Sequence, residues 1–222
     1  MLTKIQEKSI RSLQVKKGRK ESGLCLVEGK KVIELASDYV EYIFGPKDSK
    51  QFKKLVTTET PQNLAAVVRI PKWSNDDIKS KNIIVLLDSV QNPGNVGSIL
   101  RLCLGFGASL VLVDSADASS PKVIRSSVGA MFKVPWVQIS KNNVDKYLKE
   151  LNRPVYRLEN KKGSASFDKA KIITPLILVA GSEGMGIQLN IKGKSVYITH
   201  SKELESLNVS QALAIALYLL RG

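Results

Sequence analysis

The sequence is poor in the side chains that build covalent cross-links and metal centres. Its 222 residues include two cysteines and one histidine. Cys25 and Cys103 are far apart and each is flanked by apolar residues, so we expect core thiols rather than a disulfide or a pair of metal ligands. With only one histidine to add to them, the sequence indicates no zinc site and we expect no metal.

Long hydrophobic runs are also missing. No stretch approaches the roughly 18 apolar residues of a membrane helix, and the first ten residues, MLTKIQEKSI, lack the apolar core of a signal peptide. We therefore expect a cytoplasmic protein with no membrane partner. At 43% hydrophobic residues the chain can still bury a core in one large domain or two small ones, and we expect two.

Acidic residues are outnumbered by basic ones. There are 34 Lys and Arg against 20 Asp and Glu, which gives a net charge of +14. This excess favours a polyanionic partner such as nucleic acid, although solubility alone is the other explanation. The basic residues are densest in the first twenty positions, where one acidic residue, Glu7, accompanies Lys4, Lys8, Arg11, Lys16, Lys17, Arg19 and Lys20.

A polar stretch that contains proline, RIPKWSNDDIKSKN (residues 69–82), separates two apolar regions and predicts a linker. We expect a small α/β domain over residues 1–75 and a larger α/β domain over residues 76–222. In the first, the patterns predict helices at 5–15, 29–36 and 49–55 and strands at 24–27, 39–44 and 65–70.

The second region alternates strand and helix patterns. IIVLLD (83–88) and SLVLVD (109–114) are continuous apolar runs, typical of parallel strands covered on both faces. Between them, helical spacing places Ile99, Leu102, Cys103 and Phe106 on one side. We expect further strands at 134–139, 155–158, 176–180 and 196–198 and a closing helix at 209–220. The alternation predicts a mostly parallel α/β sheet that binds ligands at the carboxyl ends of its strands.

The run LVAGSEGMGI (178–187) places three glycines within six positions after an apolar segment. A dinucleotide loop would need a glycine where Glu183 stands, because that carboxylate would push into the pyrophosphate. A phosphate loop ending in GKS (193–195) would need a glycine where Gln188 stands. These failures favour a cofactor without phosphates that backbone groups hold. A tight turn between strand and helix is the alternative.

Three ordered segments narrow this choice. LLDSVQNPGNVGSILRLCLGFGA carries Asn95 and Arg101 six positions apart, LILVAGSEGMGI follows, and ESLNVSQALAIALYL closes the chain. Together with the turn RSSVGAMFKVP, they resemble the SpoU/TrmH-type RNA 2′-O-ribose methyltransferases of the SPOUT superfamily. GLCLVEGKKVIELA and TTETPQNLAAVV resemble the ribosomal-protein-like substrate-binding domain that many members carry, so the resemblance spans nearly the whole chain.

The resemblance implies S-adenosylmethionine as methyl donor, bound in a pocket that a deep trefoil knot forms in the C-terminal domain. Gly181, Ile198 and Leu207 would touch the cofactor, mostly through backbone atoms, with Ala180 and Gly184 beside them.

Arg101 would carry the catalytic step. A guanidinium stays protonated, so it would stabilise the developing alkoxide or hold an RNA phosphate that takes the proton. Asn95, Glu183, Ser206 and Asn208 would position Arg101, the loops or the substrate. Glu183 has a second interpretation as the cap of a following helix.

Two departures from the family pattern stand out. Thr199 and His200 replace the proline and the methionine or similar residue that usually follow the isoleucine of the third region. His200 is therefore either a general base or a wall of the pocket. Asn63 replaces the glycine that usually follows TPQ, which asparagine tolerates because it also adopts positive φ.

For RNA binding, the basic leader would contact phosphates and riboses, since an RNA helix hides its base edges. Helical spacing would place Lys4, Lys8 and Arg11 on one face while Ile5, Ile10 and Leu13 approach the core; a merely solvated face is the alternative. The residues expected to bind substrate are Lys16, Lys17, Arg19, Lys20 and Arg125.

The resemblance also implies a homodimer with an active site completed across the subunit contact, and VSQALAIALYLL fits such an interface. Burial within one chain would explain the same apolarity. The competing hypothesis for function is a non-catalytic RNA-binding or ribosome-assembly protein on the same fold. Asn95, Arg101 and residues 206–210 count against it, because a pure binder does not need them.

Overall fold

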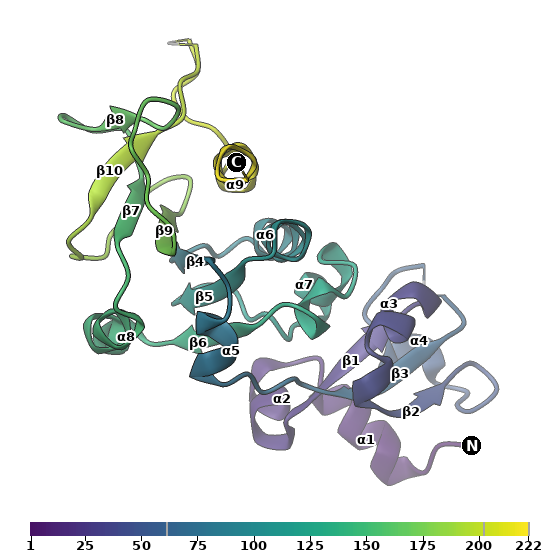
Figure 1. Cartoon of the computed structure of the whole chain (residues 1–222). Coiled ribbons are helices and arrows are strands. Elements are labelled where there is room, and N and C mark those ends of the chain that lie inside the picture. The colour runs from purple at the N-terminus through teal and green to yellow at the C-terminus, as the bar shows by residue number, and fades with distance from the viewer. Residues whose placement is uncertain (61, 202, 222) are drawn as a thin grey trace.

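The structure, a computed structural model, describes residues 1–60, 62–201 and 203–221. Pro61, which belongs to the segment TTETPQNLAAVV, lies outside the described residues. The described chain forms a three-stranded sheet and a seven-stranded sheet; in Figure 1 the N mark lies at the lower right beside α1, and the C mark lies at α9 in the upper part of the view.

The N-terminal unit, residues 1–69, surrounds the smaller sheet, which has the strand order β1-β3-β2 and is antiparallel. In chain order its elements are α1 (Lys4–Ser12), α2 (Lys16–Ser22), β1 (Leu24–Glu28), α3 (Lys30–Leu35), the 3₁₀ turn η1 (Ser37–Tyr39), β2 (Val40–Phe44), α4 (Phe52–Leu55) and β3 (Ala65–Arg69). All three predicted strands of this unit are present within a residue or two.

The C-terminal unit, residues 75–221, is built on the larger sheet, with the strand order β6-β5-β4-β9-β7-β10-β8 and parallel pairing throughout. Its elements are α5 (Asn75–Lys79), β4 (Ile83–Asp88), α6 (Pro93–Phe106), β5 (Ser109–Val113), α7 (Pro121–Ser126), η2 (Ala130–Phe132), β6 (Trp136–Ile139), η3 (Lys141–Asn143), α8 (Val144–Leu151), β7 (Val155–Leu158), β8 (Ala165–Ser166), β9 (Leu176–Gly181), β10 (Lys194–Tyr197) and α9 (Val209–Leu219). The predicted α/β fold with a mostly parallel sheet is confirmed.

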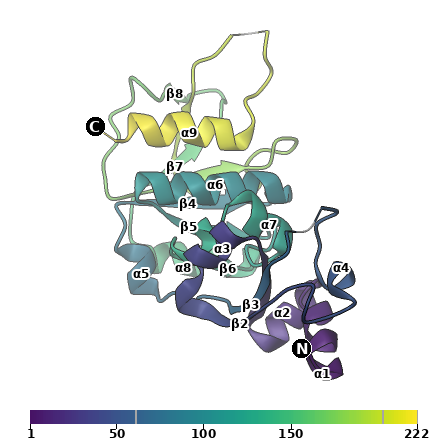
Figure 2. The same cartoon turned by 90° about the vertical axis from the view of Figure 1, so that its right-hand side faces the viewer.

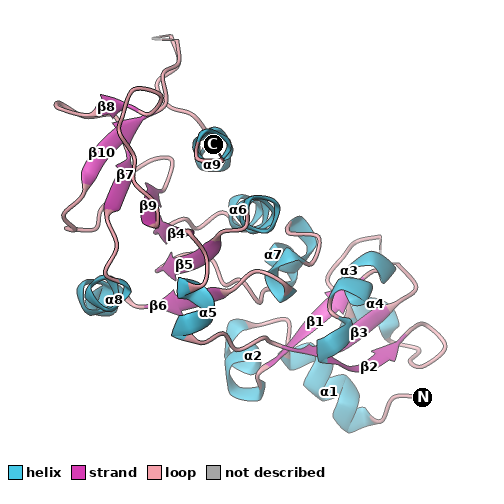
Figure 3. Cartoon of the chain, viewed as in Figure 1, coloured by secondary structure: helices cyan, strands magenta, loops and turns pink. Residues whose placement is uncertain are grey.

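Helices cover both faces of this sheet, as Figure 3 shows: α6, α7 and α9 on one face and α8 on the other. Along β4, Val85 and Leu87 point into the core on the α6 side, whereas Ile84 and Leu86 belong to the core beneath α5 and α8. Both sets are fully buried, because a strand alternates its side chains between two faces and here both faces are covered.

Helix α6 places the predicted Asn95 and Arg101. Asn92 caps it by accepting a hydrogen bond from the backbone N–H of Gly94, Pro93 occupies the first turn, and Gly107 ends it at φ +66°. The prediction of its buried face was only partly right. Ile99 and Cys103 are buried, but Leu102 and Phe106 are only half-buried, and Val96 and Leu100 complete the buried stripe instead.

The helix predicted over residues 5–15 is present as α1 but ends at Ser12, and it is followed by a second helix, α2, that was not predicted. Val15 is extended between them, and a Cβ on Gly18 would lie 2.1 Å from the carbonyl oxygen of Ser12, so glycine permits the close turn. Ile10 and Leu13 are fully buried as expected, but Ile5 is 82% exposed and the prediction for it was wrong.

The predicted linker over residues 69–82 is partly structured. Arg69 is the last residue of β3, and Ser74 starts α5 with a capping box to Asp77. Ile78 of α5 is 1% exposed and packs beneath the large sheet. Apolar periodicity could not predict this short helix, because only one of its residues, Ile78, is buried.

The two units share one hydrophobic core. Cys25 and Val27 of β1 and Val68 of β3 belong to the same buried cluster as Leu87 and Leu110. Figure 2 shows α3 in front of the larger sheet, with α7 beside it. The N-terminal unit therefore lies on the side of the sheet that carries α6 and α7, with β1 in contact with α7. Where the domain boundary falls stays a prediction.

Both cysteines are buried and free, which confirms the prediction of core thiols. Burial raises the pKa of each thiol to about 12. Within the described ranges, no helix has both the length and the apolar character needed to cross a membrane. The cytoplasmic location stays a prediction.

Candidate active site

A pocket of about 300 Å³ opens at the carboxyl ends of β9, β7 and β10, beside the start of α9. The register places these ends next to one another because the three strands are parallel neighbours. Four of the five residues predicted to bind the cofactor line it: Ala180 and Gly181 from β9, Ile198 after β10, and Leu207 before α9. Gly184, the fifth, is exposed and does not line the pocket.

The glycine run forms a tight backbone crossing rather than the entry to a helix. Gly186 lies at φ +63° and donates its backbone N–H to the carbonyl oxygen of Ser182. A Cβ on Gly181 would lie 2.1 Å from backbone atoms of Gly186, so no larger residue fits. No helix begins after Glu183 in this segment, and the interpretation of Glu183 as a helix cap was wrong.

Asp88, at the carboxyl end of β4, anchors the far side of this loop. Its carboxylate is fully buried, and Oδ2 accepts hydrogen bonds from the backbone N–H groups of Gln188, at 2.5 Å, and Leu189, at 2.8 Å. Oδ1 accepts one from Ser89 Oγ at 2.9 Å. Asp88 was not among the predicted site residues. Its position at the end of the apolar run IIVLLD was a signal, because a buried carboxylate needs hydrogen-bond partners.

Three of the predicted catalytic residues meet at the rim of the pocket. Glu183 Oε1 accepts hydrogen bonds from the side-chain amides of Asn95 and Asn208, the latter at 3.0 Å, and Asn208 also donates to Asn95 Oδ1 at 3.2 Å. Asn208 Oδ1 caps α9 by accepting from the backbone N–H of Ser210 at 2.9 Å. This cluster joins segments 113 residues apart and fixes the glycine loop against both α6 and α9.

The last part of the rim comes from the segment between β10 and α9. Ser206 lines the pocket and is exposed. His200 also lines it, and its Nδ1 lies 2.7 Å from the carbonyl oxygen of Ile198. A neutral imidazole would donate from Nδ1 in that contact and leave Nε2 as the acceptor.

Arg101 does not line this pocket. Its exposed side chain lies in a separate groove between α6 and α9, with Ser98 and Phe106 on one side and Ser210, Gln211 and Ala214 on the other. Figure 2 shows α6 and α9 running alongside each other. Within one chain, Arg101 therefore lies outside the pocket that the predicted cofactor residues line.

Glu159, which follows β7, is a wall residue that sequence reasoning missed. Arg157 Nε donates to its carboxylate at 2.8 Å, Lys161 Nζ at 2.7 Å and Ser195 Oγ at 2.6 Å. Burial disfavours its ionised form, but the hydrogen bonds from Arg157, Lys161 and Ser195 outweigh that and hold its pKa at about 2.

The side chains that line the pocket suit a positively charged ligand that carries no phosphate group. Its described lining residues include the carboxylates of Glu183 and Glu205, the carboxylate of Glu159, whose charge Arg157 and Lys161 balance, and no lysine or arginine. Ile198, Leu207 and other apolar groups offer a surface for an aromatic ring. Among the described residues, no group of three or more His, Cys, Asp or Glu is placed to hold a metal ion.

The predicted substrate residues divide into two groups. Lys16, Lys17 and Lys20 are exposed on α2. Arg19 is 4% exposed: its guanidinium binds Asp117 Oδ2 at 2.6 Å and the carbonyl oxygen of Leu13 at 2.8 Å. The prediction that Arg19 contacts RNA was therefore wrong, because its donors are used inside the protein. Arg125 keeps 32% of its side chain exposed.

The chain matches a family model and a named relative in sequence. Residues 82–218 match the model of the SpoU rRNA methylase family. The 23S rRNA (guanosine(2553)-2′-O)-methyltransferase RlmP of Bacillus subtilis is 29% identical over 97% of this chain and 95% of its own length.

Solved structures agree with this match. A TrmH-family protein from Porphyromonas gingivalis is 32% identical, covers 99% of this chain and 98% of its own, and superposes with a TM-score of 0.85. The AdoMet-bound rRNA methyltransferase of Sinorhizobium meliloti, at 22% identity over 100% of this chain and 95% of its own, has the same fold, with a TM-score of 0.86. The resemblance seen in the sequence is confirmed: the chain belongs to the SpoU rRNA methylase family.

Proposed function

We infer that the chain is an enzyme that transfers a methyl group from S-adenosylmethionine to a ribose 2′-hydroxyl of structured ribosomal or transfer RNA. The observation that carries this inference is the meeting of the three family segments at one pocket, with Gly181, Ile198 and Leu207 in its wall and Asn95, Glu183 and Asn208 at its rim.

The relatives indicate which part of the reaction is shared. Proteins from Bacillus subtilis, Streptomyces laurentii and Streptomyces viridochromogenes are named for a guanosine, an adenosine and a uridine of 23S rRNA, and all three names specify the 2′-O position. The base differs while the ribose hydroxyl does not. The reaction class therefore extends to this chain, and the identity of the nucleotide does not.

Gly181, Ile198 and Leu207 hold the cofactor. Gly181 would offer its backbone groups at the pocket wall, and Ile198 and Leu207 would offer apolar side chains that suit the adenine ring. Bound S-adenosylmethionine supplies an electrophilic methyl group. The carboxylates of the wall favour its sulfonium charge and disfavour phosphorylated nucleotides.

Arg101 acts on the hydroxyl that receives the methyl group. Its guanidinium stays protonated and stabilises the developing alkoxide, or holds an RNA phosphate that takes the proton. Asn95, Glu183 and Asn208 form the rim that keeps α6, the glycine loop and α9 in register, and Ser206 orients the substrate beside them. His200 is a pocket wall whose contact to Ile198 keeps the segment after β10 in place.

The active site is completed in a homodimer. Arg101 lies in a groove away from the pocket of its own chain, and exposed apolar residues surround that groove on α6 and α9: Leu104, Ile215, Tyr218 and Leu219. Burial of this surface against a second copy would bring Arg101 to the partner's pocket. The C-terminal segment forms the trefoil knot of the family, which the position of Asn208 against the loop after β9 supports.

The cofactor is tested by thermal melting and calorimetry with S-adenosylmethionine, its demethylated product, NADH and ATP. We expect both methyl-cycle ligands to raise the melting temperature with concentration, because they bind the native state alone. A shift with NADH or ATP and none with either methyl-cycle ligand would exclude the methyltransferase function.

A further inference from the structure

A depression of about 790 Å³ lies between the start of α6 and helix α7, on the side of α6 that faces the N-terminal unit. Gln91, Asn92, Pro93 and Gly94 form one wall, and Lys122, Arg125 and Ser126 form the other. Both charged residues among them are cations. Asn95 of the active-site rim follows this wall directly in the sequence, so the depression adjoins the proposed methylation site.

The two walls are fixed relative to each other. Ser126 Oγ donates to the carbonyl oxygen of Pro93 at 2.9 Å, and a Cβ on Gly97 would lie 1.9 Å from Ser126 Oγ. Helices α6 and α7 therefore lie in close contact where Gly97 meets Ser126, and this contact and the hydrogen bond of Ser126 to Pro93 fix the spacing of the two walls.

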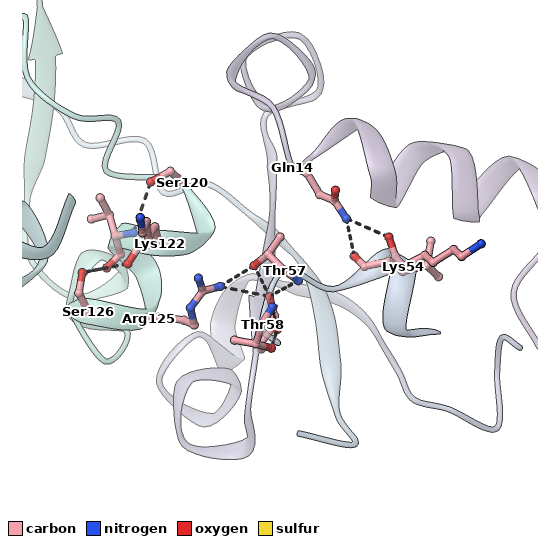
Figure 4. A network of polar contacts seen from close by, with 11 residues as sticks. Gln14, Lys54, Thr57, Thr58, Ser120, Lys122, Arg125 and Ser126 are labelled. Atoms are coloured by element: carbon pink, nitrogen blue, oxygen red, sulfur yellow. Dashed lines mark hydrogen bonds and ion pairs between the residues drawn. The ribbon is translucent and has the colours of Figure 1, made fainter. Parts of the chain in front are cut away.

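Arg125 is held from the N-terminal unit, as Figure 4 shows. Its Nη1 donates to Thr57 Oγ1 at 2.5 Å and lies 3.4 Å from Glu28 Oε1. Glu28 in turn accepts from the backbone N–H and hydroxyl of Thr57, at 2.9 and 2.6 Å, and from Thr58. Gln14 secures the preceding residues by donating to the carbonyl oxygens of Lys54 and Leu55.

This network joins the two units and also leaves part of the Arg125 guanidinium available for a ligand. The side chain of Glu28 is 5% exposed and its oxygens are occupied by the threonines. The hydrogen bonds of Arg125 to other described residues use Nη1 and leave Nε and Nη2, and the side chain stays 32% exposed. Burial disfavours ionisation of Glu28, but the hydrogen bonds from Thr57 and Thr58 lower its pKa below the usual value, so Glu28 is anionic at neutral pH.

We propose that this depression is a subsite for an RNA phosphodiester that flanks the methylated nucleotide, with Arg125 and Lys122 as its ligands and Thr57 and Glu28 as positioning residues for Arg125. The proposal rests on the proposed function. A guanidinium fixed in advance loses less side-chain entropy when it binds phosphate, and phosphate contacts set the register of a nucleic acid on a protein. Because its positioning residues come from the N-terminal unit, that unit would help to place the RNA backbone at the active site.

The test measures binding and methylation of unmodified 23S rRNA transcribed in vitro, over a salt titration, for Arg125→Ala, Lys122→Ala and Lys133→Ala. We expect each of the first two to lower the slope of log affinity against log salt by about one and to raise KM for RNA about tenfold, with unchanged affinity for S-adenosylmethionine. Lys133→Ala is the matched control: Lys133 also joins the two units, through Asp38 at 3.0 Å, but lies outside the depression. It should behave as wild type.

Thr57→Val separates positioning from charge. It removes the nearer of the two acceptors of Arg125, together with the hydroxyl that donates to Glu28, but keeps every cation. We therefore expect KM for RNA to rise while the salt slope is retained, and Thr57→Ser to restore KM.

An Arg125→Ala protein with a lower melting temperature but wild-type salt slope and KM would show a purely structural contact and overturn the subsite. A Thr57→Val protein with wild-type KM would overturn the positioning role. Neither result touches the proposed function, which fails only if wild-type protein binds no S-adenosylmethionine or methylates no RNA.

Discussion

Asp88 shows how a residue that contacts no ligand shapes the pocket. Its buried carboxylate ties the backbone of Gln188 and Leu189 to the end of β4, and the loop thus anchored carries both Glu183 and the Gly186 backbone that lies against Gly181. Loss of the carboxylate leaves both backbone N–H groups without their acceptor, at a cost of about 1–3 kcal/mol for the buried one, that of Leu189.

Asp88→Ala should therefore weaken S-adenosylmethionine binding at least tenfold, since a shift of the loop moves the backbone that we propose faces the cofactor. Asp88→Asn should retain most of the affinity, because its amide oxygen can still accept from both N–H groups while its NH₂ donates to Ser89 Oγ. Calorimetry at a temperature where both variants remain folded measures the difference. Equal affinities for the alanine and asparagine variants would refute the anchoring role.

Glu159 predicts a pH dependence of stability. Its native pKa of about 2 lies below the ordinary value of 4.5, so its contribution to stability is fully present above pH 4.5 and is lost as the pH falls toward 2. The gap in unfolding free energy between wild type and Glu159→Gln should be largest at neutral pH and should shrink through that window. Urea unfolding at a series of pH values measures it, and a gap that does not change with pH would show that ionised Glu159 contributes nothing.

At the scale of elements, the pattern of apolar residues predicted the strands and helices whose side chains are buried. β4 has the predicted bounds because a continuous apolar run leaves few alternatives inside a covered sheet. β7 also has the predicted bounds, and α9 ends one residue earlier than predicted. Short elements escaped prediction for the opposite reason. α7 has only six residues and is fixed by the Ser120 cap and the contact of Ser126 with Gly97, and such tertiary contacts leave no periodic signal.

The same limit applied to single residues of the site. The family motifs indicated Asn95, Glu183 and Asn208, which are near neighbours in space, but nothing in the motifs showed that Glu183 accepts from both asparagines. The charge of the leader pointed to Arg19 as an RNA ligand, yet burial against Asp117 decides otherwise. Charge counts identify a basic segment, and only packing shows which of its residues remain free.

Helix α2 carries the next prediction. Because Ile10, Leu13 and Arg19 are buried, deletion of the first twenty residues would disturb the core, so the three exposed lysines are the proper target. Replacing Lys16, Lys17 and Lys20 together with alanine should weaken RNA binding and lower the salt slope by about two to three. The control replaces Lys141, Lys146 and Lys149 near α8, which are also exposed. An unchanged slope in the α2 variant would mean that these lysines only face solvent.

At the scale of the whole molecule, the groove that contains Arg101 and the pocket that contains Gly181 are lined by different residues of one chain. Arg101→Ala should retain cofactor affinity but lose methyl transfer by about 10²–10³, as for removal of a charge-stabilising donor. Gly181→Val should lose cofactor binding, because a Cβ there meets the Gly186 backbone.

A homodimer with a shared site predicts that these two inactive variants complement each other. When they are mixed under conditions that exchange subunits, each mixed dimer contains one site with both functional residues, and part of the wild-type activity should return. Sedimentation of the wild type checks that the dimer forms. A mixture that stays inactive although mixed dimers are present would place Arg101 and the cofactor in the same chain's site.

The chemistry of the product tests the central claim most directly. Unmodified ribosomal RNA is incubated with the protein and with S-adenosylmethionine that carries an isotopic label in its methyl group, and the RNA is then digested to nucleosides and analysed by mass spectrometry. The account predicts a single labelled nucleoside whose methyl group is lost with the ribose when the glycosidic bond fragments, and whose formation requires Arg101. A label that stays with the base, or RNA that acquires no label while the protein binds the cofactor, would contradict ribose 2′-O-methylation.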